Sequence, residues 1–312
     1  MAQPQPHSLR ACFLAEVLGT FILVLFGCGA VHSAVLTDSL SGLWQVGVVW
    51  GLGVVMAIYA VGPISGSHIN PAITVGLAVW GMFPWRKVPA YVGAQLLGAF
   101  VAAAVLFAIY RPFLREVEDA NKVVRGLPGS EITAMCYGEY FPNPTLLKSD
   151  EELLDTELHA KFLSRVPHWA AFLAEVVATA VLGLVVCAVA NPANPLGPRN
   201  LAPAFIGLTV AALICIIGAL TQACLNPARD FGPRLFAALA GWGSIAIPGP
   251  HGVSFLTVYI LAPLLGGIAG IGLYERWIAP TIARNRELSE LEPNRTIDEP
   301  SRGETLAPDA VG

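Results

Sequence analysis

The chain has 312 residues, of which 55% are hydrophobic and only 13% are charged, and its mean hydropathy is +0.62. Residues 11–110 hold four charged side chains and residues 169–275 hold six, while the other 30 lie elsewhere. A water-soluble fold needs charge over its whole surface, so this distribution excludes a soluble enzyme and indicates an integral membrane protein. The net charge of −4 provides no basic surface for nucleic acid. The six cysteines show no paired spacing, which predicts neither a metal site nor a disulfide framework.

Six apolar runs are each long enough to cross a bilayer, which takes about 20 residues. They are residues 11–36, 43–62, 88–110, 169–190, 201–220 and 254–275. Two shorter apolar runs, 70–81 and 226–240, each follow a break that contains Gly, Pro or Asn. Short, interrupted segments at matching positions of two halves are typical of a transport site at the bilayer midplane. We therefore predict an all-α membrane protein with six transmembrane helices and two half-helices.

An internal repeat relates the two halves of the chain. Eight of 15 aligned residues are identical between 14–28 and 173–187, and the Asn-Pro-Ala segment at 70–72 recurs at 226–228. Because each copy holds three spans, the second copy must be inverted in the membrane. We predict four regions: a first inverted repeat at 1–110, an outer loop at 111–168, a second repeat at 169–278, and a disordered cytoplasmic tail at 279–312.

Basic residues near the span ends predict the orientation. With both termini in the cytoplasm, one side of the membrane carries Arg10, Arg86, Lys87, Arg199, Arg276, Arg284 and Arg286. We place residues 111–168 outside, where ten acidic residues outnumber seven basic ones. Within them, a capping box at 149–152 predicts an amphipathic helix over 153–162. The predicted location is the plasma membrane, the inner membrane if the cell is bacterial.

Asn70-Pro71 and Asn226-Pro227 each predict the start of a half-helix, because Asn is a favoured N-cap and Pro is favoured at the first helical position. If both helices point to the midplane, their dipoles place partial positive charge there and oppose cations and protons. The asparagine amides offer hydrogen-bond donors at the pore midpoint. The backbone carbonyls expected to line the pore as acceptors are those of Gly66, Ser67, His68, Gln222, Ala223 and Cys224. Donors and acceptors between apolar walls predict a pore for small neutral solutes.

One further copy of the tripeptide, Asn191-Pro192-Ala193, lies in a proline-rich linker and is not followed by an apolar run. We interpret it as a turn. The first two copies are distinguished by their context, because each lies between a span and an apolar half-helix.

Several charged residues fall within the apolar segments. Arg229 is expected to face the pore as a second barrier to cations. Asp230 and Arg234 are four residues apart and can pair on one helix. Glu16 and Glu175 occupy equivalent repeat positions; they are either proton-relay carboxylates or, as we favour, buried acceptors for the N–H groups of the irregular loops. No nucleophile–base or metal constellation is present, so an enzyme is not predicted.

The motifs SGSHINPAITV at 65–75 and CLNPARDFGPR at 224–234, with an Ala-Glu pair near the start of each repeat, look like the aquaporin superfamily. Within it, the chain resembles the aquaglyceroporin branch of bacterial glycerol facilitators, over residues 10–278. Asp230, Arg234 and the segment YFPNP at 140–144 match that branch. The resemblance implies a right-handed bundle around one pore per subunit, a homotetramer, and passive transport without a cofactor.

The resemblance also places a selectivity constriction at Trp50, Ile214, Ala223 and Arg229. Glycerol facilitators usually have Trp, Gly, Phe and Arg there, so Ile214 and Ala223 depart from the pattern. This set is similar to that of some plant nodulin-type intrinsic proteins. A water-selective pore would be expected to have His in place of Ile214.

We expect a channel that passes glycerol, other small neutral solutes and water, and that excludes ions and protons. A wider pore for uncharged metalloid acids, urea or lactic acid remains an alternative, and an ion-coupled secondary transporter is a more remote one.

Overall fold

The computed structural model describes residues 7–147 and 155–291, and all regular secondary structure within these ranges is helical. Six segments are long and apolar enough to cross a membrane: Leu9–Thr37, Gly42–Ser65, Trp85–Ala120, His168–Ala190, Arg199–Thr221 and Ser254–Glu287. The predicted all-α class and six transmembrane helices are therefore confirmed.

The two halves of the chain contain the same series of helices. The first half has α1 (Leu9–Thr37), α2 (Gly42–Ser65), α3 (Pro71–Val79) and α4 (Val88–Ala120). The second has α8 (His168–Ala190), α9 (Ala202–Thr221), α10 (Pro227–Ala237) and a final span formed by α11 (Ser254–Leu256), η6 (Thr257–Leu261), α12 (Ala262–Leu273), η7 (Tyr274–Ile278) and α13 (Ala279–Leu291). With nine and 11 residues, α3 and α10 are about half as long as a span requires. They are the two predicted half-helices.

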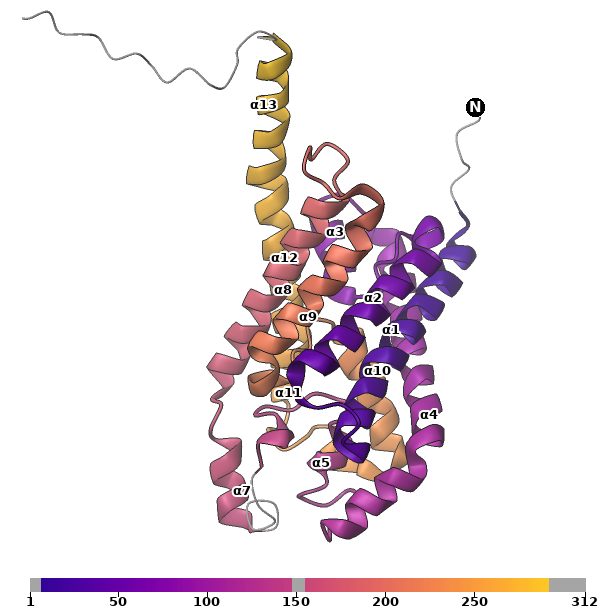
Figure 1. Cartoon of the computed structure of the whole chain (residues 1–312), viewed down its shortest axis with the longest axis vertical. Helices are drawn as coiled ribbons and strands as arrows, with labels where there is room; N and C mark the ends of the chain where they lie inside the picture. The colour runs from indigo at the N-terminus through magenta and orange to yellow at the C-terminus, as the bar shows by residue number, and fades with distance from the viewer. Residues whose placement is uncertain (1–6, 148–154, 292–312) are drawn as a thin grey trace, which may run out of the picture.

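The two ends of the molecule differ in what covers them (Figure 1). The start of α1 and helix α13 project from one end, which we call the terminal face. The connection between α4 and α8, including α5 (Glu131–Ala134) and α7 (Thr156–Leu163), covers the opposite end, which we call the loop face.

Equivalent glycines allow close helix packing in both halves. At Gly98 of α4, an added Cβ atom would lie 2.3 Å from the carbonyl oxygen of Val17 on α1. At Gly266 of α12, it would lie 2.4 Å from the carbonyl oxygen of Val176 on α8. Since Val17 and Val176 are themselves repeat equivalents, the same backbone-to-backbone contact is built twice. Small residues permit this approach in membranes, where helix packing rather than water exclusion drives association.

Two predicted boundaries are wrong. Helix α4 continues to Ala120, ten residues into the region predicted as a loop, because Leu114 and Glu118 pack in the interior and Glu118 accepts hydrogen bonds from Arg125 and Thr133. The tail is helical rather than disordered over Ala279–Leu291, because α13 continues the last span without a break. The remaining tail residues lie outside the described ranges.

The sequence predicts an amphipathic helix in the outer loop over residues 153–162. Its described part is α7 (Thr156–Leu163), which is capped by Asp155: the side chain accepts hydrogen bonds from the N–H groups of Glu157 and Leu158. The predicted capping box at 149–152 lies outside the described residues. Phe162 is buried on the inner side of α7, as its position in the predicted apolar face requires.

The third Asn-Pro-Ala copy forms a turn after α8, as predicted. The Asn191 side chain accepts a hydrogen bond from the N–H of Ala193 and donates one to the Tyr274 hydroxyl, 2.9 Å away. It therefore ties the end of one span to another and starts no half-helix.

The substitution Gly98→Ala should destabilise the protein. The added methyl group would meet the Val17 carbonyl and force α1 and α4 apart, at a cost of about 1–3 kcal/mol. Gly93, also on α4, is exposed with open space around its Cβ position, so Gly93→Ala should be neutral or slightly stabilising. Thermal unfolding of the detergent-solubilised variants measures the difference, and equal Tm values would refute the packing argument.

Candidate functional site

The two half-helices begin at the asparagine–proline pairs that the sequence indicated. Asn70 and Asn226 are extended N-caps, with φ of −157° and −150°, and Pro71 and Pro227 are the first helical residues. The Asn70 side-chain oxygen accepts a hydrogen bond from the N–H of Ala72 at 2.8 Å. That of Asn226 accepts one from the N–H of Ala228 at 3.0 Å. Both side chains are thereby held at a helix N-terminus with their amide nitrogens directed away from it.

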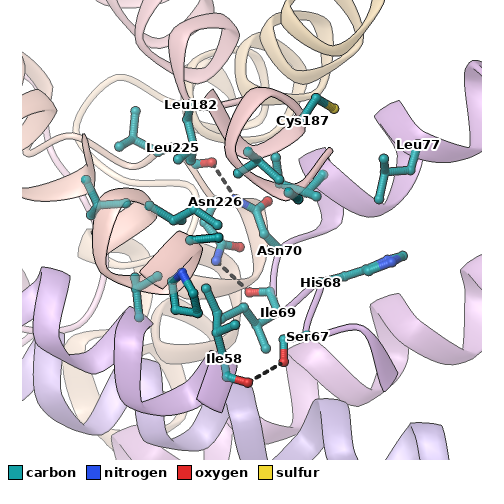
Figure 2. A pocket seen from close by; sticks show the side chains of 18 of the residues that line it. Ile58, Ser67, His68, Ile69, Asn70, Leu77, Leu182, Cys187, Leu225 and Asn226 are labelled. Atoms are coloured by element: carbon teal, nitrogen blue, oxygen red, sulfur yellow. Dashed lines mark hydrogen bonds between the residues drawn. The ribbon is translucent and has the colours of Figure 1, made fainter. Parts of the chain in front are cut away.

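Two reciprocal hydrogen bonds join the half-helices (Figure 2). The Asn70 amide nitrogen donates to the carbonyl of Leu225 at 2.9 Å, and the Asn226 amide nitrogen donates to the carbonyl of Ile69 at 2.8 Å. Each nitrogen carries two hydrogens, so a second one is left for a molecule in the cavity that both residues line. These bonds were not predicted from the sequence, although the repeat equivalence of the two segments was a signal for them.

A buried glutamate holds the backbone that precedes each asparagine. The Glu16 carboxylate accepts hydrogen bonds from the N–H groups of His68 and Ile69, at 2.9 and 2.7 Å. In the same way, Glu175 accepts from the N–H groups of Cys224 and Leu225, both at 2.9 Å. Serine and threonine hydroxyls complete the two sites, from Ser65 to Glu16 and from Thr221 to Glu175. These contacts correspond to the acceptor interpretation of the two carboxylates.

The held backbone is conformationally unusual. Ser67 and Ile69 before the first half-helix, and Ala223 and Leu225 before the second, have positive φ values of 49°, 43°, 58° and 55°. Left-handed conformations cost side-chain-bearing residues on the order of 1–3 kcal/mol each. Hydrogen bonds to the two glutamates offset this cost, so the irregular backbone is held open beside the cavity and does not continue as helix.

A cavity of about 560 Å³ runs from the half-helix N-termini to the terminal face, where Glu275 and Ala279 line it. Most of its wall is apolar. Of the predicted carbonyl-bearing residues, it is lined by Gly66, Ser67, His68, Ala223 and Cys224. Gln222 lies outside the lining: its side chain accepts a hydrogen bond from the N–H of Tyr140 at 2.8 Å and so anchors the loop that covers the cavity.

The cavity is lined by all four residues predicted for the constriction, and all four are buried: Trp50, Ile214, Ala223 and Arg229. The guanidinium carbon of Arg229 lies 4.1 Å from the Trp50 ring centroid, a cation–π contact that orients the arginine. Arg229 also forms an ion pair with Glu139, a residue of the 111–168 segment that the sequence analysis did not single out.

Asp230 and Arg234 form the predicted pair on α10, with 2.7 Å between charged atoms. The Arg234 guanidinium also donates to the carbonyls of Glu139 and Ala246. Asp230 accepts a hydrogen bond from the N–H of Glu139 at 2.8 Å. This pair therefore fastens the loop face to α10, directly above the constriction.

Among the described residues, no group of three or more His, Cys, Asp or Glu side chains could hold a metal ion.

Residues 4–274 match the major intrinsic protein family. The chain is 38% identical to the glycerol uptake facilitator protein of Pseudomonas aeruginosa, over 94% of this chain and 98% of that protein. It is 37% identical to the protein of the same name from Escherichia coli (strain K12), over 88% and 90%. It is 38% identical to a propanediol uptake facilitator of Citrobacter freundii, over 89% and 96%. Its fold is similar to the crystal structure of the aquaglyceroporin from Plasmodium falciparum, with a TM-score of 0.70, 26% identity, and coverage of 89% of this chain and all of that one.

The substitution Glu175→Leu should lower stability markedly. It would leave the N–H groups of Cys224 and Leu225 buried without an acceptor, at about 1–3 kcal/mol each. Glu157→Leu, on the exposed side of α7, is the matched control and should change little. Thermal unfolding and recovery after detergent extraction report the difference. If both variants behaved alike, Glu175 would not be holding the loop.

Proposed function

This chain belongs to the major intrinsic protein family, and from that premise we propose that it is a passive channel for glycerol and other small neutral solutes, together with water. The observation that carries the proposal is the cavity, whose mostly apolar wall also includes residues of the irregular backbone before each half-helix and the side-chain donors Asn70, Asn226 and Arg229. It is not an enzyme, and no cofactor is needed for diffusion through such a pore.

The lining suits a polyol because it combines hydrogen-bonding groups with a mostly apolar wall. Hydroxyl oxygens accept hydrogen bonds from the two asparagine amides and from Arg229, while hydroxyl hydrogens are donated to carbonyls of the held backbone. The carbon skeleton faces Trp50 and the aliphatic wall. Ions are opposed because the cavity offers too few ligands to replace a hydration shell, and because two helix N-termini direct partial positive charge at its centre.

The proposal extends to topology and assembly. Residues 1–110 and 169–278 are inverted repeats. The terminal face lies in the cytoplasm and the loop face outside, so both termini are cytoplasmic. The location is the plasma membrane. Apolar side chains at repeat-equivalent positions, such as Leu14 and Leu173, are more than half exposed and would face lipid or neighbouring subunits of a homotetramer.

A wider range of solutes is the second candidate, and two residues favour it. Ile214 and Ala223 carry no polar side-chain atoms at the constriction, and the methyl group of Ala223 occupies little of the space beside Trp50 and Arg229. Uncharged metalloid acids, urea or lactic acid would then pass as well.

Stopped-flow light scattering on proteoliposomes tests the function directly. Water, glycerol and urea gradients should each relax faster than in empty liposomes, with a solute flux that rises linearly with concentration. The flux should not depend on a proton or sodium gradient. An absence of glycerol flux would refute the proposal, and saturable flux driven by an ion gradient would identify a secondary transporter instead.

The substitution Ala223→Phe should narrow the constriction. A phenyl ring there fills space beside Trp50 and Arg229, so the permeability ratio of ribitol to glycerol should fall about tenfold. Ala212→Phe places the same ring on the exposed side of α9 and serves as the control. An unchanged ratio in Ala223→Phe would show that residue 223 does not limit solute size.

A further inference from the structure

The cavity combines three sources of positive potential. Helices α3 and α10 both direct their N-termini at it, each equivalent to roughly half an elementary charge, and Arg229 adds a full one. All three oppose cations. Each of them also attracts anions, because helix N-termini and arginines are the groups with which proteins bind anions. A negative charge near Arg229 would cancel this attraction for anions.

Glu139 is placed to supply that charge. Its carboxylate forms an ion pair with Arg229, and the residue is only 1% exposed. Among the described residues, its second carboxylate oxygen has no hydrogen-bond partner, so its charge is not taken up by another group. This differs from a surface ion pair, whose effect is weakened by water and salt.

The main chain of Glu139 is anchored at two points. Its N–H donates to Asp230 at 2.8 Å, and its carbonyl accepts from the Arg234 guanidinium. The carboxylate therefore faces Arg229 because the loop is fastened to the same half-helix that carries the arginine. These two hydrogen bonds fix the loop backbone at Glu139.

The other charged groups nearby are already in an ion pair or accept hydrogen bonds from the backbone. Asp230 and Arg234 neutralise each other at 2.7 Å, and Glu175 accepts hydrogen bonds from the loop N–H groups of Cys224 and Leu225. Tyr140 and Tyr259 lie beside Arg234 and are uncharged phenols. Glu139 is thus the carboxylate that offsets Arg229 at the outer end of the cavity.

We propose that Glu139 is a specificity-determining residue that keeps small anions out of the channel by neutralising the constriction arginine. The N-termini of the two half-helices still oppose cations, and Glu139 removes the attraction for anions that Arg229 would otherwise create. The inference rests on the proposed channel function. Glu139 is not one of the four predicted constriction residues, and the exclusion of anions is a role that those four do not supply.

The test uses the full chain in proteoliposomes and compares nitrate with glycerol. Potassium nitrate gradients are applied with valinomycin, so that potassium compensates the charge and nitrate entry limits swelling. In Glu139→Gln the permeability ratio of nitrate to glycerol should rise about tenfold or more, the size of effect that an uncompensated charge has on local ion concentration. In Glu139→Asp, which keeps the charge, the ratio should stay near that of the native protein.

Glu131→Gln is the matched control. Glu131 is also a buried carboxylate of the 111–168 segment, but its partners are the N–H of Gly129, at 2.7 Å, and the imidazole of His159, at 3.6 Å. Its nitrate-to-glycerol ratio should remain native.

Three results would overturn the proposal. The first is an unchanged nitrate ratio in Glu139→Gln that still conducts glycerol, which leaves the channel function intact. The second is a rise in the leak of ribitol and potassium in Glu139→Gln that equals the rise for nitrate. Potassium leak is measured without valinomycin. An equal rise would mean that Glu139 acts by narrowing the pore and not through its charge. The third is an equal rise in Glu131→Gln. Absence of glycerol flux in the native chain is a separate outcome, which refutes the proposed function itself.

A second pair of variants applies if Glu139→Gln does not fold. Arg229→Val leaves Glu139 as the uncompensated charge, so its potassium leak should exceed that of the native chain. Adding Glu139→Gln to Arg229→Val should reduce that leak. A double variant that leaks potassium as strongly as Arg229→Val alone would contradict a charge role for Glu139.

Discussion

The pair of hydrogen bonds between Asn70 and Leu225 and between Asn226 and Ile69 is the constraint on which the centre of this protein depends. Two half-helices enter from opposite ends, and each presents an N-terminus whose free N–H groups would be costly to leave in a bilayer. Capping by the asparagine oxygens satisfies part of this need, and the amide nitrogens join the two helices across the centre. The two short helices together thus form a path across the membrane that neither half of the chain could form alone.

Five charged residues within the apolar segments support this central structure. Glu16 and Glu175 hold the irregular backbone from behind, and Asp230 with Arg234 fastens the loop face to α10. Arg229 faces the cavity, between the Trp50 ring and the Glu139 carboxylate. A charged side chain at this depth is expensive unless it is paired, hydrogen-bonded or functional. Each of these five residues is paired or hydrogen-bonded, and the low charge of the apolar segments reflects the small number of such places.

Much of the site could be predicted because the signals were local or repeated. The N-cap and first-turn preferences of Asn and Pro place both half-helices correctly, and the repeat identifies which Asn-Pro-Ala copies matter. Asn191 shows why context was needed, since the same tripeptide there ends in a turn. Glu139 was missed because nothing in its own neighbourhood distinguishes it from the other acidic residues of a long loop. Its significance comes from contacts with Arg229 and Asp230, about 90 residues away along the chain.

Hydropathy, periodicity and the internal repeat by themselves determined the six spans, the two half-helices and the asparagines at which these begin, because burial in a bilayer requires long apolar runs and satisfied backbone groups. The tertiary structure alone decided which donors face which acceptors. It directs the Gln222 side chain to the backbone of the loop, continues the last span into α13, and brings the loop carboxylate of Glu139 against Arg229. These outcomes depend on how distant segments pack, and the energy of a buried hydrogen bond or ion pair is gained only when both partners are in place.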